Sequence, residues 1–270
     1  ERLSDYDYVL PEELIAQVPL EDRSASRLLR LHPDGRIENR KFTDVIDILS
    51  EGDLLIMNDT RVSALRLFGN RSTGAAIEAL LLREIRPRCF EALVKPGKRM
   101  RVGTVVEFGD QLAATVTEEL EEGLRVLEFA ADEHLHGKLD SIGWTPLPPY
   151  IHESLRDRER YQTVYGMVGG SAAAPTAGLH FTKDILTALQ DRGVDTATVT
   201  LHVGLDTFRP IQVEELSEHR MHGEMCSIDE VTGEKISKAK GRIIAVGTTT
   251  VRTLESFATG RRKVATGTRN

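Results

Sequence analysis

Three groups of residues in this chain combine side chains that bind anions, donate hydrogen bonds or transfer protons. The first is Asn58-Asp-Thr-Arg61, the second is His202 with the loop 204–210, and the third is Thr248, Thr249 and Arg252. Each group lies at or directly after the end of a run predicted to be a strand. In open α/β sheets, ligands bind beyond the carboxyl ends of the strands, and a helix N-terminus there attracts negative groups. If the strands are parallel neighbours, the groups converge on one site. Taken singly, each group is explained by a turn or a helix cap.

A run of small residues, Gly169 to Gly178, precedes a predicted helix start. Glycine, alanine and serine let the backbone approach a ligand closely. The run contains neither the phosphate-loop pattern ending in Gly-Lys-Ser/Thr nor Gly-x-Gly-x-x-Gly, so a nucleoside triphosphate or dinucleotide site is not indicated. The alternative is a tight connection packed under a helix.

Two histidines, His180 and His202, lie beside these segments. With an unperturbed pKa near 6.5, histidine is a natural acid or base at neutral pH. Both residues are therefore candidates for proton transfer. The alternative is that they pack as hydrogen-bonded core histidines.

Metal ligation is the other chemistry that the histidines allow. His219 and His222 are three residues apart and close to Glu224, and His134 and His136 are two apart. Zinc sites need three or four ligands, and neither pair has a compelling third ligand nearby. We therefore expect no metal. A metal-dependent hydrolase using His219, His222 and Glu224 stays open as an alternative.

The densest basic stretch is Lys95-Pro-Gly-Lys98-Arg99-Met-Arg101, at a predicted turn. Lysine and arginine in such a turn would contact phosphates of a nucleic acid, or would simply be solvated. With 35 basic and 42 acidic residues, the formal charge is −7, so any nucleic-acid contact must be local.

Short elements must position these residues. In 1–62 we expect a helix over 11–18 that starts at Pro11, a helix over 42–49 and a buried strand over 53–58. After residue 146 we expect a helix capped by Thr182, an alternating strand over 197–203, a strand over 242–247, and a helix that begins near Val251 and is capped by Thr248 to Thr250.

The stretch 63–145 differs in character, with short extended runs separated by glycines. Such spacing predicts an antiparallel barrel or sandwich inserted into the α/β part. The expected strands are 65–68, 76–82, 90–95, 104–108, 112–117 and 124–129.

The composition, with 40% hydrophobic and 29% charged residues, is that of a globular protein with a real core. The chain has two cysteines far apart, Cys89 and Cys226, and no run of about 18 apolar residues. It starts with no apolar leader. These features predict a cytoplasmic protein, with no contact to a membrane and no feature that demands more than a monomer.

Several long segments resemble the bacterial S-adenosylmethionine:tRNA ribosyltransferase-isomerase family of queuosine synthesis. The matching segments are Leu14-Ile-Ala-Gln-Val-Pro19, Ser26-Arg-Leu28, Gly52-Asp-Leu-Leu55, Asn58-Asp-Thr-Arg-Val62, Pro146-Leu-Pro-Pro-Tyr-Ile151, Tyr161-Gln-Thr-Val-Tyr165, Ser171 to Phe181, Thr200-Leu-His-Val-Gly204 and Val246 to Arg252.

The resemblance implies a layered α/β domain, 1–62 and 146–270, with a β-barrel domain inserted at 63–145. It implies an enzyme that transfers the ribosyl part of S-adenosylmethionine onto 7-aminomethyl-7-deazaguanine at the tRNA wobble position and isomerises it, giving epoxyqueuosine, adenine and methionine. The substrates would be tRNAs with a GUN anticodon. S-adenosylmethionine is then a co-substrate, and no bound cofactor is expected.

Roles follow from the needs of that reaction. His180, His202 and Glu224 are candidates for proton transfer. Arg61 and Arg252 would hold the methionine carboxylate through bidentate contacts, with Thr248 and Thr249 at the helix start. Further substrate-binding candidates in the matched segments are Asn58, Thr60, Tyr161, Gln162, Pro175, Thr176 and Gly178. Lys95, Lys98, Arg99 and Arg101 would bind tRNA.

The chain departs from the family pattern at three places. Ala64 and Leu65 replace Pro-Ala, and Asp206 replaces a glycine. Family members also continue for roughly 70–80 residues past the position of Asn270, in a part that carries a Thr-Asn-Phe-His-Leu-Pro motif. A second alternative to the enzyme is a non-catalytic tRNA-binding module, in which the β domain and its basic turn bind the tRNA.

Overall fold

The computed structural model describes residues 1–109, 112–155, 157–204, 211, 213–219 and 223–270. The chain divides into two compact units. The first comprises residues 1–61, 148–168 and 174–270, and the second comprises 62–147 and 169–173. The second unit is thus inserted into the first. The fold is mixed α/β with a closed antiparallel barrel, as the sequence predicts.

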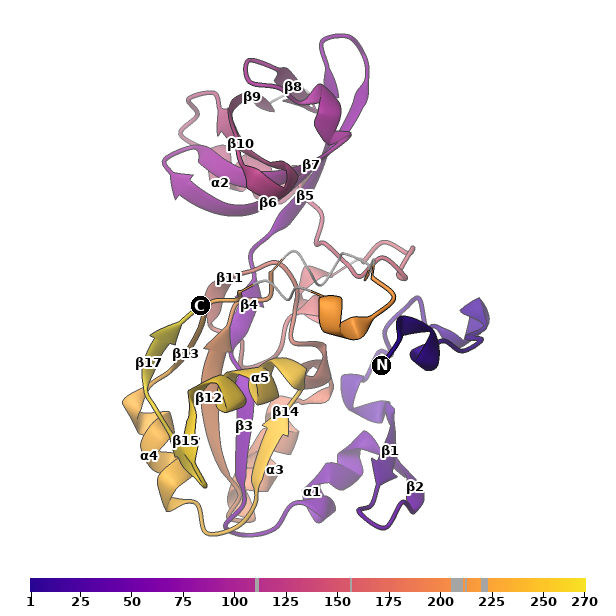
Figure 1. The fold of residues 1–270 in the computed structure, drawn as a ribbon, viewed down its shortest axis with the longest axis vertical. Helices are drawn as coiled ribbons and strands as arrows, with labels where there is room; N and C mark the ends of the chain where they lie inside the picture. The colour runs from indigo at the N-terminus through magenta and orange to yellow at the C-terminus, as the bar shows by residue number, and fades with distance from the viewer. Residues whose placement is uncertain (110–111, 156, 205–210, 212, 220–222) are drawn as a thin grey trace. The chain divides into compact units, whose positions relative to one another are not determined.

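A mixed sheet forms the centre of the first unit (Figure 1). Its strand order is β14-β3-β12-β13-β17, and β14 and β12 both run parallel to β3. The strands are β3 (Leu54–Asn58), β12 (Asp195–Leu201), β13 (Cys226–Ile228), β14 (Ile243–Val246) and β17 (Gly267–Arg269). The carboxyl ends of β3, β12 and β14 therefore meet at one edge, as expected from the three polar groups.

Successive side chains of β3 point to opposite faces of the sheet, and each face contacts a different helix. Leu55 and Met57 pack with Ile185 and Leu189 of α3 (Lys183–Asp191). The alternate residue Asn58 points to the opposite face, where it meets Thr249 of α5 (Thr248–Phe257). Residues of both faces of β3 are buried, so α3 and α5 cover opposite faces of the sheet (Figure 1).

The start of α3 is confirmed and that of α5 is not. Thr182 caps α3, because its side chain accepts a hydrogen bond from the Ile185 amide at 3.2 Å. The cap of α5 is Gly247 rather than Thr248 to Thr250, and the helix begins about one turn earlier than expected. Gly247 has a φ of +84°, which lets the chain turn from β14 directly into the helix. The Thr250 hydroxyl then donates to the Val246 carbonyl at 2.8 Å.

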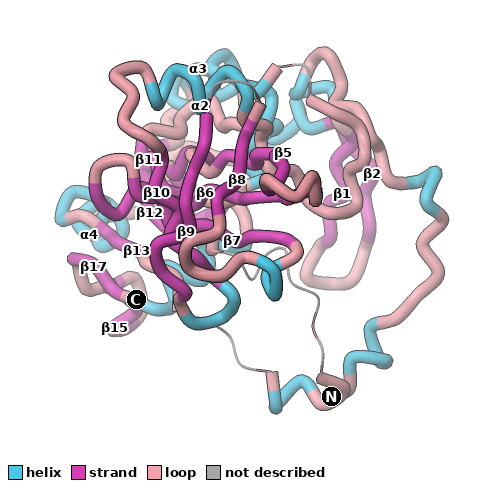
Figure 2. Tube along the Cα trace, turned by 90° about the horizontal axis from the view of Figure 1, so that it is seen from above, coloured by secondary structure: helices cyan, strands magenta, loops and turns pink. Residues whose placement is uncertain are grey.

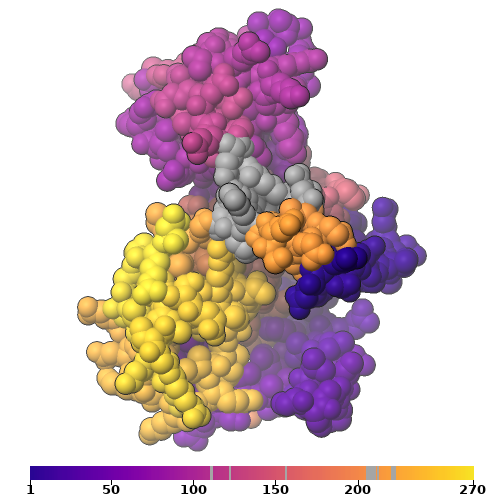
Figure 3. All heavy atoms as spheres, viewed as in Figure 1, coloured from indigo at the N-terminus to yellow at the C-terminus, as the bar shows by residue number. Residues whose placement is uncertain are grey.

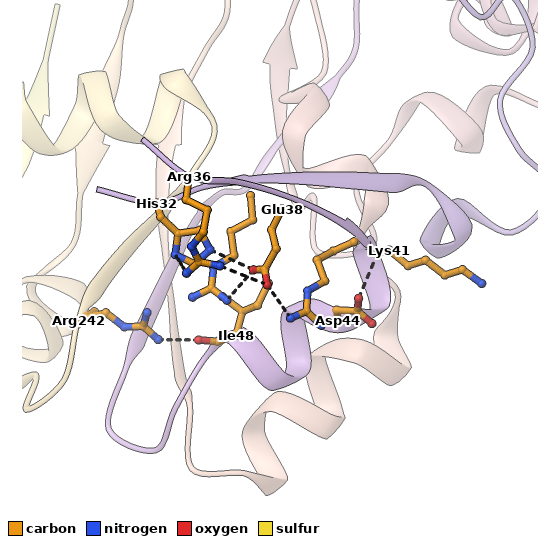
Figure 4. A network of polar contacts seen from close by, with 9 residues as sticks. His32, Arg36, Glu38, Lys41, Asp44, Ile48 and Arg242 are labelled. Carbon is orange, nitrogen blue, oxygen red and sulfur yellow. Dashed lines mark hydrogen bonds and ion pairs between the residues drawn. The ribbon is translucent and has the colours of Figure 1, made fainter. Parts of the chain in front are cut away.

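An ion pair fixes the opposite, amino edge of the sheet. The Arg242 guanidinium binds the Asp53 carboxylate, which is 3% exposed. It also donates to the Ile48 carbonyl at 2.8 Å, as Figure 4 shows. Ile48 ends α1 (Val45–Ile48), which follows a three-ten turn at Phe42–Asp44, in place of the single helix expected over 42–49. Figure 4 also shows the separate polar contacts of the hairpin of β1 (Arg27–Leu31) and β2 (Ile37–Lys41), where His32 contacts Glu38 at 3.0 Å.

The barrel of the second unit closes in the order β10-β7-β6-β5-β8-β9 (Figures 1 and 2). Its strands are β5 (Leu65–Arg71), β6 (Ala76–Arg86), β7 (Cys89–Lys95), β8 (Val105–Phe108), β9 (Leu112–Glu119) and β10 (Leu124–Phe129). Every strand expected in this stretch is confirmed. The core includes Phe108 and Phe129, and α2 (Leu135–Ile142) adds Leu135 and Leu139 to it.

The helix predicted over 11–18 is wrong. Only a short three-ten turn forms there, Glu12–Leu14, because no described side chain in this segment is buried well enough to support a longer helix. The chain start instead lies beside residues 214–216: the Leu3 amide donates to the Glu214 carbonyl at 2.7 Å (Figure 3, indigo and orange).

Shorter elements connect or flank those already named. They are β4 (Thr60–Val62), β11 (Val168–Ser171), α4 (Glu230–Lys238), β15 (Ala258–Gly260) and β16 (Lys263–Val264). No helix in the described ranges is long and apolar enough to cross a membrane.

Candidate active site

The side chain of Asn58 ties two strand ends and a helix start together. Its Nδ2 donates to the Leu201 carbonyl at 3.0 Å and to the Thr249 hydroxyl at 3.3 Å. Its Oδ1 accepts from the amides of Thr60 at 3.2 Å and Leu201 at 3.1 Å. Asn58 is fully buried and uses both ends of its amide, so it shapes the site by holding β3, β12 and α5 in register.

The next residue, Asp59, brings a carboxylate to the other face of the same edge. Its amide donates to the Val199 carbonyl at 3.0 Å, and its Oδ1 accepts from the Thr200 hydroxyl at 2.8 Å. His202 lies two residues beyond Thr200 and therefore on the same side of the strand. Burial raises the pKa of the Asp59 carboxyl, while the Thr200 and Thr198 hydroxyls and His202 oppose that shift. Burial lowers the pKa of His202, against the attraction of Asp59.

The segment 163–168 covers this pair. The amides of Met167 and Val168 donate to the Asp59 carbonyl at 2.8 and 3.1 Å. Burial and the neighbouring Asp59 both raise the pKa of the Tyr165 hydroxyl. That hydroxyl reaches the small-residue segment: a Cβ added to Gly178 would lie 1.9 Å from it. Gly178 is therefore required by the close approach of Tyr165.

The small-residue segment also reaches the start of α5. A Cβ added to Gly247 would lie 3.2 Å from the Cβ of Ala177. Ala177 and Gly178 belong to the three-ten turn Thr176–His180, so this turn lies against the helix start that carries Thr248 and Thr249. The turn, the helix start and the end of β3 are thus neighbours, as the motif groups predicted.

Glu224 and Arg252 form an ion pair with an N–O distance of 2.5 Å. The other carboxylate oxygen of Glu224 accepts from the Gly204 amide at 2.9 Å. The carboxylate is 13% exposed, and Arg252 is 37% exposed. Glu224 is thus held by two donors beside the end of β12, which suits a residue that orients Arg252.

Other predicted site residues lie in different surroundings. Arg61 forms an ion pair with Glu159. The His180 ring packs on Phe42, with centroids 5.3 Å apart. Tyr161 is buried, which raises the pKa of its hydroxyl to about 12, and the Gln162 carbonyl accepts from Arg23 at 3.0 Å. Pro175 is buried, whereas Thr176 is exposed.

The predicted tRNA-binding residues lie on the barrel. Lys95 ends β7, and Lys98 and Arg99 belong to the three-ten turn Gly97–Arg99. Lys95, Lys98, Arg99 and Arg101 are all exposed, while Met100 between them is fully buried in the barrel core. The buried Arg125 donates to the carbonyls of Met100 at 2.7 Å and Gly97 at 3.3 Å. The Arg125 side chain therefore fixes the backbone of the basic turn through these hydrogen bonds.

No group of three or more His, Cys, Asp or Glu side chains that could hold a metal ion occurs among the described residues. His219 is exposed, and His222 and Asp206 lie outside the described residues. His134 immediately precedes α2, and His136 contacts Glu84 at 2.9 Å.

Four buried polar atoms near Asp59 have no hydrogen-bond partner among the described residues: Thr60 Oγ1, Thr163 Oγ1, Tyr165 Oη and His202 Nδ1. Buried polar groups are nearly always paired, so this concentration indicates a place that receives a polar ligand. The residue patterns placed Asp59 in the first polar group without predicting a role for it, and they did not single out Thr163, Tyr165 or Thr200. Asp59 and Tyr165 stood in matched motifs, but nothing in the chain order shows that they are neighbours.

The fold and the site together define an α/β protein with an inserted barrel and a polar site at the carboxyl edge of its sheet. The chain matches the family described as queuosine biosynthesis protein over residues 3–270. It is 49% identical over 272 residues to the S-adenosylmethionine:tRNA ribosyltransferase-isomerase of Desulforamulus reducens, a match that covers 98% of this chain and 80% of the relative. The chain therefore belongs to the queuosine biosynthesis protein family.

A crystal structure of an S-adenosylmethionine tRNA ribosyltransferase from Thermotoga maritima is also similar to this chain. It is 33% identical, and the match covers 97% of this chain and 77% of that one with a TM-score of 0.45.

Proposed function

We propose that this chain is an S-adenosylmethionine:tRNA ribosyltransferase-isomerase. The observation that carries the proposal is the 49% identity to a relative of that name over 98% of the chain. The alternatives of a non-catalytic tRNA-binding module and a metal-dependent hydrolase are not favoured by these comparisons.

The finer reaction is part of the proposal. The ribosyl part of S-adenosylmethionine is transferred to the aminomethyl group of 7-aminomethyl-7-deazaguanine at the wobble position of tRNAs with a GUN anticodon. The ribosyl ring is isomerised to the epoxycyclopentane of epoxyqueuosine, and adenine and methionine leave. We further propose that the protein acts as a monomer in the cytoplasm.

The chemistry of the candidate active site supports this reaction. A proton next to the sulfonium must be removed, and the departing adenine needs a proton donor. His202 is suited to proton transfer, because it is only partly exposed and burial lowers its pKa, which favours the neutral ring at neutral pH. Glu224 is fixed by Arg252 and the Gly204 amide, so we propose that it orients Arg252 toward the methionine carboxylate.

The start of α5 supplies a second anion site. Its first amides have no partner within the helix, and the helix dipole favours negative charge there. Thr248 and Thr249 lie in this first turn, and Thr249 is held by Asn58. We propose that the amides of this turn and the Thr248 hydroxyl bind the carboxylate of the methionine part.

The test of the activity is release of adenine. The chain is incubated with S-adenosylmethionine and tRNA carrying 7-aminomethyl-7-deazaguanine, with chelator present in one arm. Adenine release that requires the tRNA and resists the chelator supports the proposal. Binding of tRNA with no adenine release supports the binding module instead, and chelator-sensitive hydrolysis of other substrates supports the hydrolase.

The barrel turn offers a test of the tRNA surface. Replacing Lys98, Arg99 and Arg101 together by Gln should weaken tRNA binding about equally for all tRNA sequences. It should also reduce the slope of log K against log salt by about 0.9 for each phosphate that is no longer neutralised. The affinity for S-adenosylmethionine alone should not change. The matched control is Arg192→Gln, which removes an exposed positive charge from the ion pair with Asp47 in the first unit.

A further inference from the structure

Among the residues that the structure describes, the partly buried Asp59 carboxylate has no positively charged partner. No ion pair joins it to a lysine or arginine of the described ranges, and it accepts a hydrogen bond from the Thr200 hydroxyl at 2.8 Å. Two other carboxylates of the first unit, the buried Asp53 and the partly buried Glu224, are paired with Arg242 and Arg252. A buried anion is costly unless it is paired, so Asp59 is the exception that calls for a partner.

The groups that face Asp59 come from two elements. From β12 and its end come Thr198, Thr200 and His202, and from the segment 163–168 comes Tyr165. His202 and Tyr165 are the titratable groups of this set. Both are neutral at neutral pH, because burial lowers the pKa of His202 and raises that of Tyr165. The Asp59 carboxylate is thus surrounded by neutral hydroxyl and imidazole groups.

Several of these neutral groups also have unused hydrogen-bonding capacity. Tyr165 Oη, His202 Nδ1 and Thr163 Oγ1 are buried and have no partner in the described part of the chain. A carboxylate without a cation, surrounded by unsatisfied neutral polar atoms, is complementary to a ligand that carries a positive charge next to hydroxyl groups.

We infer that Asp59 is a substrate-binding carboxylate that holds a cationic group of the substrate beside Tyr165 and His202. This inference rests on the proposed function, whose substrates offer two such cations. One is the sulfonium of S-adenosylmethionine, which adjoins the ribose hydroxyls. The other is the aminomethyl group of the tRNA base in its ammonium form. Both are bound by the same charge, and the experiment separates them.

Asp59→Asn removes the charge with little change of shape, and its amide oxygen still accepts from Thr200. Affinities are measured by calorimetry for S-adenosylmethionine and for S-adenosylhomocysteine, which has a neutral sulfur without the methyl group. We expect the variant to lose about tenfold to hundredfold in affinity for S-adenosylmethionine and less than about twofold for S-adenosylhomocysteine. In the wild type, affinity for S-adenosylmethionine should also fall as pH falls and Asp59 is protonated, and in the variant it should not.

The second arm measures the KM for tRNA carrying 7-aminomethyl-7-deazaguanine. A KM raised about tenfold or more by Asp59→Asn, with an unchanged preference for S-adenosylmethionine over S-adenosylhomocysteine, assigns the cation to the tRNA base. Equal losses for both sulfur ligands without a raised KM for the tRNA, or no change in either arm, overturn the inference.

Two further variants separate charge from structure. Thr200→Val removes the hydrogen bond but keeps the carboxylate, so the preference for S-adenosylmethionine should persist. If Asp59 only positioned β12, Thr200→Val would act like Asp59→Asn.

The matched control is Asp195→Asn, at the amino end of the same strand, where an exposed carboxylate pairs with Lys235. If the wild type releases no adenine, the proposed function fails. The binding measurements still decide the cation subsite, because an Asp59→Asn variant that binds both S-adenosylmethionine and the modified tRNA as tightly as the wild type overturns it.

Discussion

Gly178→Ala is the change for which the structure sets the clearest cost. The added Cβ would lie 1.9 Å from the Tyr165 hydroxyl and 2.9 Å from Thr163 Cγ2. An ordinary contact needs at least 3.4 Å, so the hydroxyl would have to move by about 1.5 Å, the difference between the two distances. The backbone at Gly178 is not in the left-handed region, so the effect is steric and comes mainly from the tyrosine.

We expect this change to reduce both stability and activity. Overpacking of this kind costs about 1–3 kcal/mol, which lowers the melting temperature by about 2–12 °C for a unit of this size. The rate of adenine release should fall even at temperatures where the variant is fully folded, because the displaced Tyr165 hydroxyl moves away from Asp59 and His202. Melting is followed by circular dichroism and activity by adenine release at a temperature where the variant is folded.

A double variant tests the cause. In Gly178→Ala with Tyr165→Phe the hydroxyl is absent, and the nearest remaining atom of the ring, Cζ, lies 2.9 Å from the new Cβ. The required shift falls to about 0.5 Å, so the double variant should be more stable than the sum of the single changes predicts. Gly260→Ala in the same unit is the control, since its Cβ would meet nothing within 4 Å. A Gly178→Ala protein with wild-type melting and activity, or one that Tyr165→Phe does not rescue, would show that the tyrosine does not set this cost.

Three further predictions concern single side chains. Arg242→Ala should cost about 1–3 kcal/mol in urea unfolding at pH 7. Burial alone would raise the pKa of Asp53, but Arg242 and the Ser50 amide lower it, so this stabilisation is lost as pH falls through the lowered pKa. The variant should therefore lose less stability on acidification, and an equal loss would contradict this. His202→Gln should flatten the pH dependence of melting, because the folded protein lowers the pKa of His202 and loses stability as pH falls below about 6.5. Unchanged turnover in this variant would also rule out a catalytic His202. Thr182→Ala should cost about 1 kcal/mol by removing the cap of α3, whereas Thr182→Ser should retain most of that stability in the same urea measurement.

Local patterns were sufficient for most of the elements that build the site. The alternation of β12, the apolar run of β3 and the cap at Thr182 were all predicted, because each depends on residues within a few positions. The strands of the barrel were predicted for the same reason. The helix over 11–18 failed because an amphipathic pattern forms a stable helix only when something covers its apolar side.

The candidate active site was predictable as a set of segments but not as a set of contacts. Parallel strands bring their carboxyl ends together, so the joining of Asn58 to Leu201 and Thr249 follows from the strand order. The partners of the charged residues did not follow. Arg61 and Arg252 were expected to hold the methionine carboxylate, and the structure pairs them with Glu159 and Glu224. Residues separated by 98 and 28 positions meet only through the fold.

The order of residues along the chain was enough to establish the α/β class with an inserted barrel, the strands that end in polar residues and, through the motifs, the family. Periodicity and capping are local properties, so the chain order contains them. Only the tertiary structure shows which charged side chains have an oppositely charged partner. There, Asp59 has no cationic partner among the described residues, while Tyr165 and His202 are brought to it from other segments. The pairing and burial of a charge depend on neighbours distant in the chain, and those neighbours are set only when the sheet and its loops have packed.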